Sequence, residues 1–239
     1  MRPWLFVELG GSSTQTTQRD AFGRLWFSPC LVREAGRPVA LACPGLIRDG
    51  RVLYATNLGW PDDADPAREL GLESVAIVEN DAVAAGLGES VLRSGEWPLL
   101  DLLYVTLGTG VGSAQVIDGV ASDLDLGHRY VGGDVYCSGC RNVGCLNAYL
   151  CSQRLPATLG ADDQAFVARM LAGALRDMAL VERLPLVLAG GIARRYPAIV
   201  ALVDALIPNP TESTAAPSEA KSAAYAGLEH LARRRSTLD

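Results

Sequence analysis

Residues 105–112 are Val-Thr-Leu-Gly-Thr-Gly-Val-Gly, and this stretch decides the fold of the chain. It closes an apolar run that begins at Leu102, which predicts a buried strand over 102–107. The glycines predict a turn after that strand, and the residues near 114–117 predict a returning strand. Backbone N–H groups in such a turn can bind phosphate, although an ordinary hairpin is the alternative. The candidate phosphate turn consists of Gly108, Thr109 and Gly110.

A second glycine turn follows the first strand of the chain. Leu5–Leu9 is a short apolar run, and small or hydroxyl residues follow it directly. Two such turns after two apolar strands indicate two related halves that face one nucleotide. Gly190 and Gly191 follow the predicted strand 186–188, where glycine lets a ligand approach the backbone or simply makes a tight turn. The candidate phosphate-facing residues of the second turn are Gly10, Gly11, Ser12 and Thr14.

A carboxylate stands at a strand-to-helix junction in the first half of the chain. Residues 74–78 are a candidate buried strand, and Glu79-Asn80-Asp81 follow it, before a run of apolar residues that suits a helix entering the core. Such junctions are where α/β enzymes place their chemistry. Asp81 is therefore a candidate catalytic residue. The alternative is that it caps the helix that follows it.

One histidine and three cysteines lie close together in the middle of the chain. Two residues separate Cys137 from Cys140, and four separate Cys140 from Cys145, while His128 lies nine positions upstream of Cys137. Zinc prefers four tetrahedral sulfur or nitrogen ligands from short, turn-rich segments. The pattern therefore predicts a zinc site, with buried apolar cysteines and a non-ligating histidine as the alternative. Burial as an apolar side chain is the usual fate of a cytosolic cysteine such as Cys30, Cys43 or Cys151.

The composition fits a globular protein and argues against two classes of partner. The chain has 239 residues, of which 49% are hydrophobic, with 21 Lys and Arg against 27 Asp and Glu and a net charge of −6. The basic residues are scattered apart from residues 233–235, so we expect no nucleic-acid partner. No segment reaches the ~18 apolar residues of a membrane span, and the first apolar run is too short for a signal peptide. We therefore expect a cytoplasmic protein without a membrane partner.

The second half of the chain predicts few further elements. We expect a helix over 162–182, a strand over 186–188, a loop over 207–218 and a terminal helix over 219–234. These expectations rest on apolar periodicity and on the positions of proline and small polar residues.

Taken in order along the chain, the motifs resemble the ROK family of bacterial sugar kinases and related repressors. They are Gly-Gly-Ser-Ser-Thr (10–14), Asn-Leu-Gly-Trp (57–60), Glu-Asn-Asp-Ala (79–82), Leu-Gly-Thr-Gly-Val-Gly (107–112), Gly-His (127–128), the cysteine cluster and Ala-Gly-Gly-Ile (189–192). The resemblance covers most of the chain. It implies the actin-like ATPase fold, a ribonuclease H-like α/β architecture of two domains with a cleft between them.

The resemblance also implies how the chain divides and assembles. We expect a small α/β domain from 1–98 plus 219–239, and a larger α/β domain with the zinc loop from 99–218. Repressors of the family carry an N-terminal helix-turn-helix, whereas this chain begins at the first phosphate strand, so we expect no DNA-binding role. Little sequence lies between Ser152 and Leu186, where the family adds helices. We expect a homodimer or higher homo-oligomer to cover the apolar surface left there.

Matched residue by residue, the resemblance implies a role for each site residue. Asp81 would be the general base that takes a proton from a sugar hydroxyl as that hydroxyl attacks the γ-phosphate of ATP. Mg²⁺ is implied together with ATP, and Glu8 stands where the family has the acid of its first turn. The two glycine turns would bind the phosphates, and Gly190 and Gly191 would line the adenosine pocket. The residues implied to bind the sugar are Asn57, Asn80, Asp81, Asp125, His128 and Asn147.

The zinc implied by the resemblance is structural. It would fix the wall of the sugar pocket, because the loop that carries the histidine also reaches the sugar. Loop asparagines that stabilise their own turns are the alternative for Asn57 and Asn80. The implied zinc ligands are His128, Cys137, Cys140 and Cys145.

Four departures from the family pattern change the expected pocket. Glu8 replaces an aspartate, although Mg²⁺ demands near-ideal octahedral geometry at about 2.1 Å. Asp125 and Asn147 each replace a sugar-contacting glutamate, so the pocket loses charge and reach. One extra residue separates Cys137 from Cys140, so Cys137 would need a local bulge to reach the metal.

The sequence therefore predicts an ATP-dependent kinase of a sugar or sugar-like polyol. Because Asp125 and Asn147 alter the pocket, we expect a modified acceptor such as an amino sugar, a deoxy sugar or a cyclitol. Two alternatives stay open: a non-catalytic sugar-binding protein that descends from a kinase, and a phosphate-transferring enzyme with a non-sugar acceptor.

Overall fold

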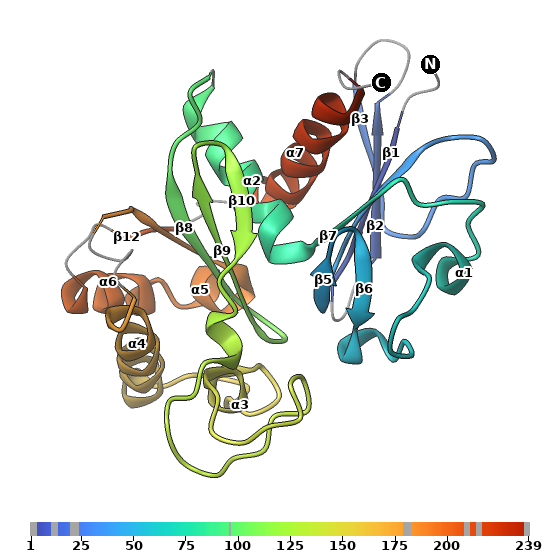
Figure 1. Ribbon diagram of the computed structural model, residues 1–239. Helices are drawn as coiled ribbons and strands as arrows, with labels where there is room; N and C mark the ends of the chain where they lie inside the picture. The colour runs from blue at the N-terminus through green and yellow to red at the C-terminus, as the bar shows by residue number, and fades with distance from the viewer. Residues whose placement is uncertain are drawn as a thin grey trace.

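The computed structural model describes residues 4–10, 14–19, 24–95, 97–178, 183–207, 211–213 and 217–236. Within these residues the chain forms two five-stranded mixed sheets with helices between and around them (Figure 1). The first sheet has the order β3 (Leu25–Ser28), β2 (Thr14–Arg19), β1 (Leu5–Leu9), β4 (Val39–Cys43) and β7 (Ile77–Asn80). The second has the order β10 (Val120–Asp123), β9 (Val111–Ile117), β8 (Leu102–Leu107), β11 (Leu186–Ala189) and β12 (Thr211–Ser213).

The two sheets share one topology. In each, three strands consecutive in the chain pair antiparallel, and two later strands add parallel to the first of the three. Parallel strands need a crossover connection. The antiparallel strands β2 and β3 lie between β1 and β4 in sequence, whereas helices lie between the strands of the other parallel pairs. The two related halves that the glycine turns indicate are therefore present in the backbone. A short separate hairpin joins β5 (Leu46–Arg48) to β6 (Arg51–Tyr54).

Two helices form the layer between the sheets. Figure 1 shows α2 (Asp81–Ser94) beside the C-terminal helix α7 (Pro217–Ser236), both placed between the sheets. They approach closely because glycines lie at their contact: a Cβ on Gly88 would stand 1.6 Å from the Ala223 carbonyl oxygen, and one on Gly227 would stand 1.9 Å from that of Ala84. No side chain fits at either position, so glycine there sets the helix spacing.

Strand alternation explains how both faces of each sheet are buried. Leu5, Val7 and Leu9 join one core, whereas Phe6 of the same strand packs toward α7. In the second sheet the faces of β8 divide in the same way, with one face toward α2 and α7. The outer core of this sheet is covered by α4 (Ala161–Arg176), α5 (Gly190–Arg195) and α6 (Pro197–Leu206).

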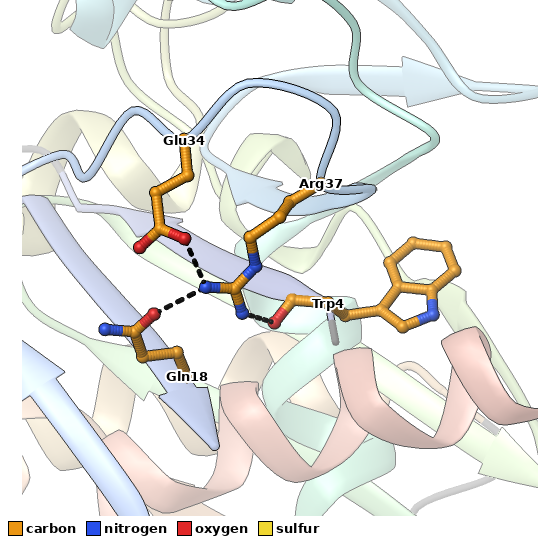
Figure 2. A network of polar contacts seen from close by, with 4 residues as sticks. All are labelled: Trp4, Gln18, Glu34 and Arg37. Carbon is orange, nitrogen blue, oxygen red and sulfur yellow. Dashed lines mark hydrogen bonds and ion pairs between the residues drawn. The ribbon is translucent and has the colours of Figure 1, made fainter. Parts of the chain in front are cut away.

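Arg37 secures the start of the first sheet. Its guanidinium donates to Gln18 Oε1 at 2.7 Å, to Glu34 Oε2 at 2.8 Å and to the Trp4 carbonyl oxygen at 3.0 Å (Figure 2). The Arg37 side chain is 9% exposed, so these charge-assisted bonds act in a partly desolvated setting. They tie the segment before β1 to β2 and to the loop that leads into β4.

Several element boundaries differ from the sequence expectations. The strand expected over 74–78 is β7, which begins later because its pairing with β4 runs from Ile77 to Asn80. The returning strand near 114–117 begins earlier, at Val111, because it pairs with the whole of β8. Pairing between strands fixed both spans, and a local apolar pattern does not contain that information.

The C-terminal third departs from expectation more. The helix expected over 162–182 is α4, which ends at Arg176, and residues 179–182 lie outside the described residues. The loop expected over 207–218 contains β12, a polar edge strand recognised only by its parallel pairing with β11. The terminal helix begins at Pro217, because proline suits the first turn of a helix.

The remaining elements are short, and the domain boundaries stay a prediction. No helix among the described residues combines the length and apolar character that crossing a membrane requires. Helix α7 packs on the first sheet and on α2, and its Ala223 and Ala224 also pack with residues of the second sheet. The short elements are α1 (Pro66–Leu70), α3 (Leu146–Leu150), η1 (Thr56–Leu58) and η2 (Leu126–His128).

Candidate functional site

One cavity joins the two halves of the molecule. It lies where β4 and β7 end and where the glycine turn follows β8. The space between its walls, with the open solvent at its mouth included, is about 1020 Å³. None of its described lining residues is Lys or Arg. The lining residues are Pro44, Gly45, Leu46, Tyr54, Thr56, Asn57, Asn80, Asp81, Thr106, Gly108, Thr109, Gly110, Val111, Gly112, Ser113, Asp123, Asp125, Gly127, His128, Gly139 and Asn147.

Asp81 lies at the first position of α2 and faces this cavity. Its Oδ1 accepts from the Ala82 backbone N–H at 2.9 Å. Burial raises the pKa of Asp81 from 3.8 to about 6, against the lowering effect of backbone hydrogen bonds. A carboxyl group with a pKa near neutrality is well suited to accept a proton at physiological pH.

Asn80, and not Asp81, is the N-cap of α2. Its Oδ1 accepts from the backbone N–H groups of Ala82 at 2.9 Å and Val83 at 3.2 Å. Its Nδ2 donates to the Gly45 carbonyl oxygen at 2.9 Å. The amide of Asn80 is therefore mostly occupied by the protein, and one N–H is left for a ligand. The capping role weighed for Asp81 belongs chiefly to its neighbour.

The glycine turn after β8 is held at both ends by protein contacts. Gly108 N–H donates to the Gly110 carbonyl oxygen at 2.9 Å, which closes the turn. Ser152 N–H donates to the Gly108 carbonyl oxygen at 3.0 Å, and the Val111 N–H donates to Asn147 Oδ1 at 2.8 Å. Gly108, Gly110 and Thr109 all line the cavity opposite Asp81. The second half thus supplies a turn of the kind that binds phosphate.

The first glycine turn is only partly described. Gly11 and Ser12 lie outside the described residues, so nothing follows for them. Glu8, Gly10 and Thr14 are described, and the cavity lining does not include them. Glu8 still lies near the site, because it pairs with Ala42 of β4, and Ala42 pairs with Glu79, two residues before Asp81.

The other predicted residues divide into two groups. One group lines the cavity, and it consists of Asn57, Asp125, His128 and Asn147. Gly190 and Gly191 begin α5 and do not line it. At Gly190 the backbone φ is +93°, and a Cβ would stand 2.2 Å from the Leu107 carbonyl oxygen, so packing against β8 alone requires glycine there.

Sequence reasoning missed Asp123. This carboxylate ends β10, lines the cavity and accepts from the Asp125 backbone N–H at 2.8 Å. Desolvation raises its pKa, and the charge of Asp125 acts in the same direction. A signal was available, because the Asp118-Gly119 turn predicts a hairpin whose second strand ends near Asp123. The other missed polar residues are Tyr54, Thr56, Thr106 and Ser113.

The predicted zinc ligands converge beside the cavity. The ligand atoms of His128, Cys137, Cys140 and Cys145 all lie within 4.8 Å of one another. Cys140 Sγ lies 3.8 Å from Cys145 Sγ, and His128 Nδ1 lies 3.9 Å from the sulfurs of both Cys137 and Cys145. A tetrahedron with Zn–S arms of about 2.3 Å has edges of about 3.8 Å. Donor set and spacing both fit zinc.

The extra residue between the first two cysteines is absorbed by a tight turn. Cys137 N–H donates to the Asn142 carbonyl oxygen at 2.8 Å, and Arg141 N–H donates to that of Cys137 at 2.9 Å. Arg141 has a left-handed φ of +61°. An antiparallel bridge between Tyr136 and Val143 closes the loop of residues 136–143, which we call the knuckle. Cys137 therefore reaches the other ligand atoms.

Two sheets of matching topology, with paired helices between them and a cavity at their facing ends, define the actin-like ATPase fold. The structure superposes on that of a ROK family glucokinase from Streptomyces griseus in complex with glucose and AMPPNP, with a TM-score of 0.72 and 19% identity. The superposition covers 98% of this chain and 100% of the glucokinase chain. The ROK family model matches residues 31–204, well over half of the chain. The chain belongs to the ROK family.

Curated relatives within the family differ in what they do. A xylose repressor from Caldicellulosiruptor bescii is 32% identical over 130 residues, which are 49% of this chain and 31% of the repressor. N-acetylmannosamine kinase from Shigella boydii is 31% identical over 205 residues, which are 78% of this chain and 68% of the kinase. The chain thus spans about a third of one relative and about two thirds of the other.

Proposed function

We propose that this protein is an ATP-dependent kinase that phosphorylates a hydroxyl of a sugar or sugar-like polyol. The observation that carries the proposal is Asp81: a mostly buried carboxyl with a pKa raised to about 6 faces the same cavity as the glycine turn at 108–112. A base and a phosphate turn across one cavity are what phosphoryl transfer to an alcohol requires. The similarity to N-acetylmannosamine kinase and to a glucose-bound glucokinase supports a sugar acceptor.

In the proposed reaction Asp81 accepts the proton of the acceptor hydroxyl. The hydroxyl oxygen forms a bond to the γ-phosphorus of ATP, and the bond from that phosphorus to the β-phosphate oxygen breaks, which releases ADP. The turn would bind phosphate oxygens through the backbone N–H groups of Thr109 and Gly110, because the Gly108 N–H donates to the Gly110 carbonyl oxygen within the turn. Mg²⁺ bound with ATP would neutralise the developing phosphate charge. Glu8 pairs with Ala42 near the end of β4, the strand that ends at the cavity, and it is the residue we propose to coordinate magnesium.

The acceptor pocket would be formed mainly by groups with free hydrogen-bonding capacity. We propose Asn57, Asp125 and His128 as direct sugar contacts, because each lines the cavity. Asn80 has one N–H left to offer, so its contribution would be a single donor. His128 would bind zinc through Nδ1, the nitrogen nearest the sulfurs, which leaves its other nitrogen for the acceptor.

The activity should depend on pH through Asp81. A general base works only when deprotonated, and the pKa of Asp81 is raised from 3.8 to about 6. We expect kcat/KM to be level above pH 7 and to fall about tenfold per unit as the pH drops below 6. A pH profile of kcat/KM measures this directly. A profile that stays level down to pH 4.5 would exclude Asp81 as the base.

The acceptor is expected to be a modified sugar or cyclitol and not plain glucose. Asp125 and Asn147 stand where the family has glutamates, and Asp123 adds a third carboxylate beside Asp81 and Asp125 without any lysine or arginine in the described lining. Such a lining favours an acceptor with a cationic or hydrogen-donating substituent, such as an amino sugar. ADP release should be measured with Mg·ATP across hexoses, amino sugars, N-acetylhexosamines, deoxy sugars and cyclitols. Glucose turnover well above that of every modified acceptor would refute this preference.

A non-catalytic sugar-binding protein is the second candidate. The absence of Glu8 from the described cavity lining favours it, because a kinase needs its magnesium acid close to the phosphates. A binder would bind the sugar and release no ADP. A third candidate, transfer to a non-sugar acceptor, predicts turnover that is indifferent to substitution of Asn57.

The proposed setting is the cytoplasm, with a homodimer or larger homo-oligomer. Trp26 and Phe27 on the edge strand β3 are 60% and 48% exposed, which provides apolar surface for self-association. We propose no nucleic-acid and no membrane partner, in keeping with the net charge of −6.

A further inference from the structure

The amide of Asn147 stands between the metal cluster and the glycine turn. Its Oδ1 accepts from the Val111 N–H at 2.8 Å, and its Nδ2 donates to Cys137 Sγ at 3.4 Å. The orientation follows from chemistry, because a backbone N–H can only donate and so must face the amide oxygen. The NH₂ group is then left for the sulfur. One side chain therefore contacts both a metal ligand and the turn.

The segment that carries Asn147 links the same two regions by its backbone. Cys145 is the N-cap of α3, so the helix begins at a metal ligand. Just beyond its end, the Ser152 N–H donates to the Gly108 carbonyl oxygen at 3.0 Å. Residues 145–152 thus form hydrogen bonds with the glycine turn at Gly108 and again at Val111. The first of these residues, Cys145, is also one of the four candidate metal ligands.

Two glycines allow this close approach to the amide. A Cβ on Gly110 would stand 2.9 Å from Asn147 Oδ1, and a Cβ on Gly139 would stand 3.5 Å from Nδ2 and 2.9 Å from His128 Cε1. The turn and the knuckle therefore enclose the amide from opposite sides. Its position is fixed by packing as well as by hydrogen bonds.

We propose that Asn147 is a positioning residue that couples zinc binding to the order of the phosphate turn. Its N–H groups hold the Cys137 thiolate in place for zinc, and its carbonyl oxygen holds the Val111 N–H, so binding of the metal orders residues 108–111. An amide suits this position because a carboxylate accepts from Val111 but donates nothing to a thiolate. The idea rests on the proposed function only in that the turn binds phosphate.

Zinc affinity tests the sulfur end of the link. Asn147→Asp keeps an acceptor for Val111 and removes the donor to Cys137, so we expect zinc to bind 10- to 100-fold more weakly, as for other groups that orient metal ligands. Competition with a chromophoric chelator measures this without any turnover. Asn142→Asp is the matched control, because Asn142 is exposed in the same knuckle and donates to the Cys140 carbonyl oxygen at 3.2 Å. Equal losses in both variants, or none in Asn147→Asp, would overturn the proposal.

Amide hydrogen exchange tests the other end of the link. In the zinc-loaded protein we expect exchange in peptides that cover 108–112 to be at least tenfold slower than in the zinc-free protein. In zinc-saturated Asn147→Ala, which lacks both hydrogen bonds, exchange there should be at least tenfold faster, while peptides from β1 keep their wild-type rate. Wild-type exchange of the turn in this variant would exclude the coupling. A failure of the kinase proposal would appear only in the ADP assay, so the two ideas are tested separately.

Discussion

Replacing Asp81 with asparagine is expected to lower kcat/KM for phosphoryl transfer by roughly 10²- to 10⁴-fold, the usual contribution of a general base. Asparagine has nearly the same shape and retains an oxygen to accept the Ala82 N–H. Sugar and nucleotide affinities should therefore change little. ADP release and equilibrium binding, measured side by side on both proteins, check this. Unchanged turnover would exclude Asp81 as the base, and wild-type protein that binds sugar but never releases ADP would favour the non-catalytic alternative.

The same variant should be more stable than the wild type at high pH. Because the folded-state pKa of Asp81 is raised from 3.8 to about 6, the folded protein binds this proton more tightly than the unfolded chain does. Stability from this group is therefore greatest below pH 4 and declines as the pH rises through about 6. Two pKa units correspond to about 3 kcal/mol, and the part of Asp81 open to the cavity reduces this to about 1–3 kcal/mol.

Urea unfolding at pH 4 and pH 8 measures the expected gain, which should be present at pH 8 and absent at pH 4. Asp65→Asn is a suitable control, because Asp65 caps α1 through the Ala67 N–H at 2.9 Å and asparagine caps a helix equally well. A loss of stability in Asp81→Asn at pH 8 would mean that the negative charge of Asp81 stabilises helix α2. It would then argue for a structural role of Asp81 and against a role in the reaction.

Removal of zinc is expected to cost on the order of 10 kcal/mol of folding free energy, which is comparable with the whole stability of a domain. Cys137 and Cys145 are each 2% exposed, so the loop buries two thiols that the metal would hold together. Without it, little apolar packing remains there, since the local cluster contains only Ala148 besides these cysteines among its fully buried members. Thermal melts with and without a strong chelator, together with metal analysis, check this expectation.

Serine substitutions provide the matched comparison. Cys145→Ser should lose zinc and lower the melting temperature strongly, because serine is a poor zinc ligand. Cys151→Ser lies just after α3 and outside the four-ligand cluster, so it should keep both zinc and stability. Equal zinc content in the two variants, or a melting temperature insensitive to chelator, would contradict a structural metal.

The local patterns predicted strands and motifs well where the signal was short-range. The strands over 5–9 and 102–107 have the bounds that their apolar runs predict, because a buried strand needs apolar residues throughout. The four metal-binding candidates, close in sequence, are also close in space. Local patterns do not predict Asp123, because its importance comes from the cavity and its own short strand is mostly exposed.

The sequence by itself determined the family, the fold class and the identity of the chemical groups. Glycine turns after apolar strands, a carboxylate at a strand end and thiols at ligand spacing are all local signals, because backbone conformation and side-chain chemistry are set within a few residues. These signals named Asp81, the turn at 108–110 and the metal cluster, although the spacing of Cys137 and Cys140 gave no account of how the first thiol reaches the others.

Only the tertiary structure decided which of these groups work together. It assigned the cap of α2 to Asn80, required glycine at position 190 for packing against β8, added Asp123 to the cavity and placed the amide of Asn147 between a thiol and the glycine turn. Each of these depends on contacts between residues far apart in the chain. Hydrogen-bond partners and burial are properties of the packed molecule, so no spacing along a single chain contains them.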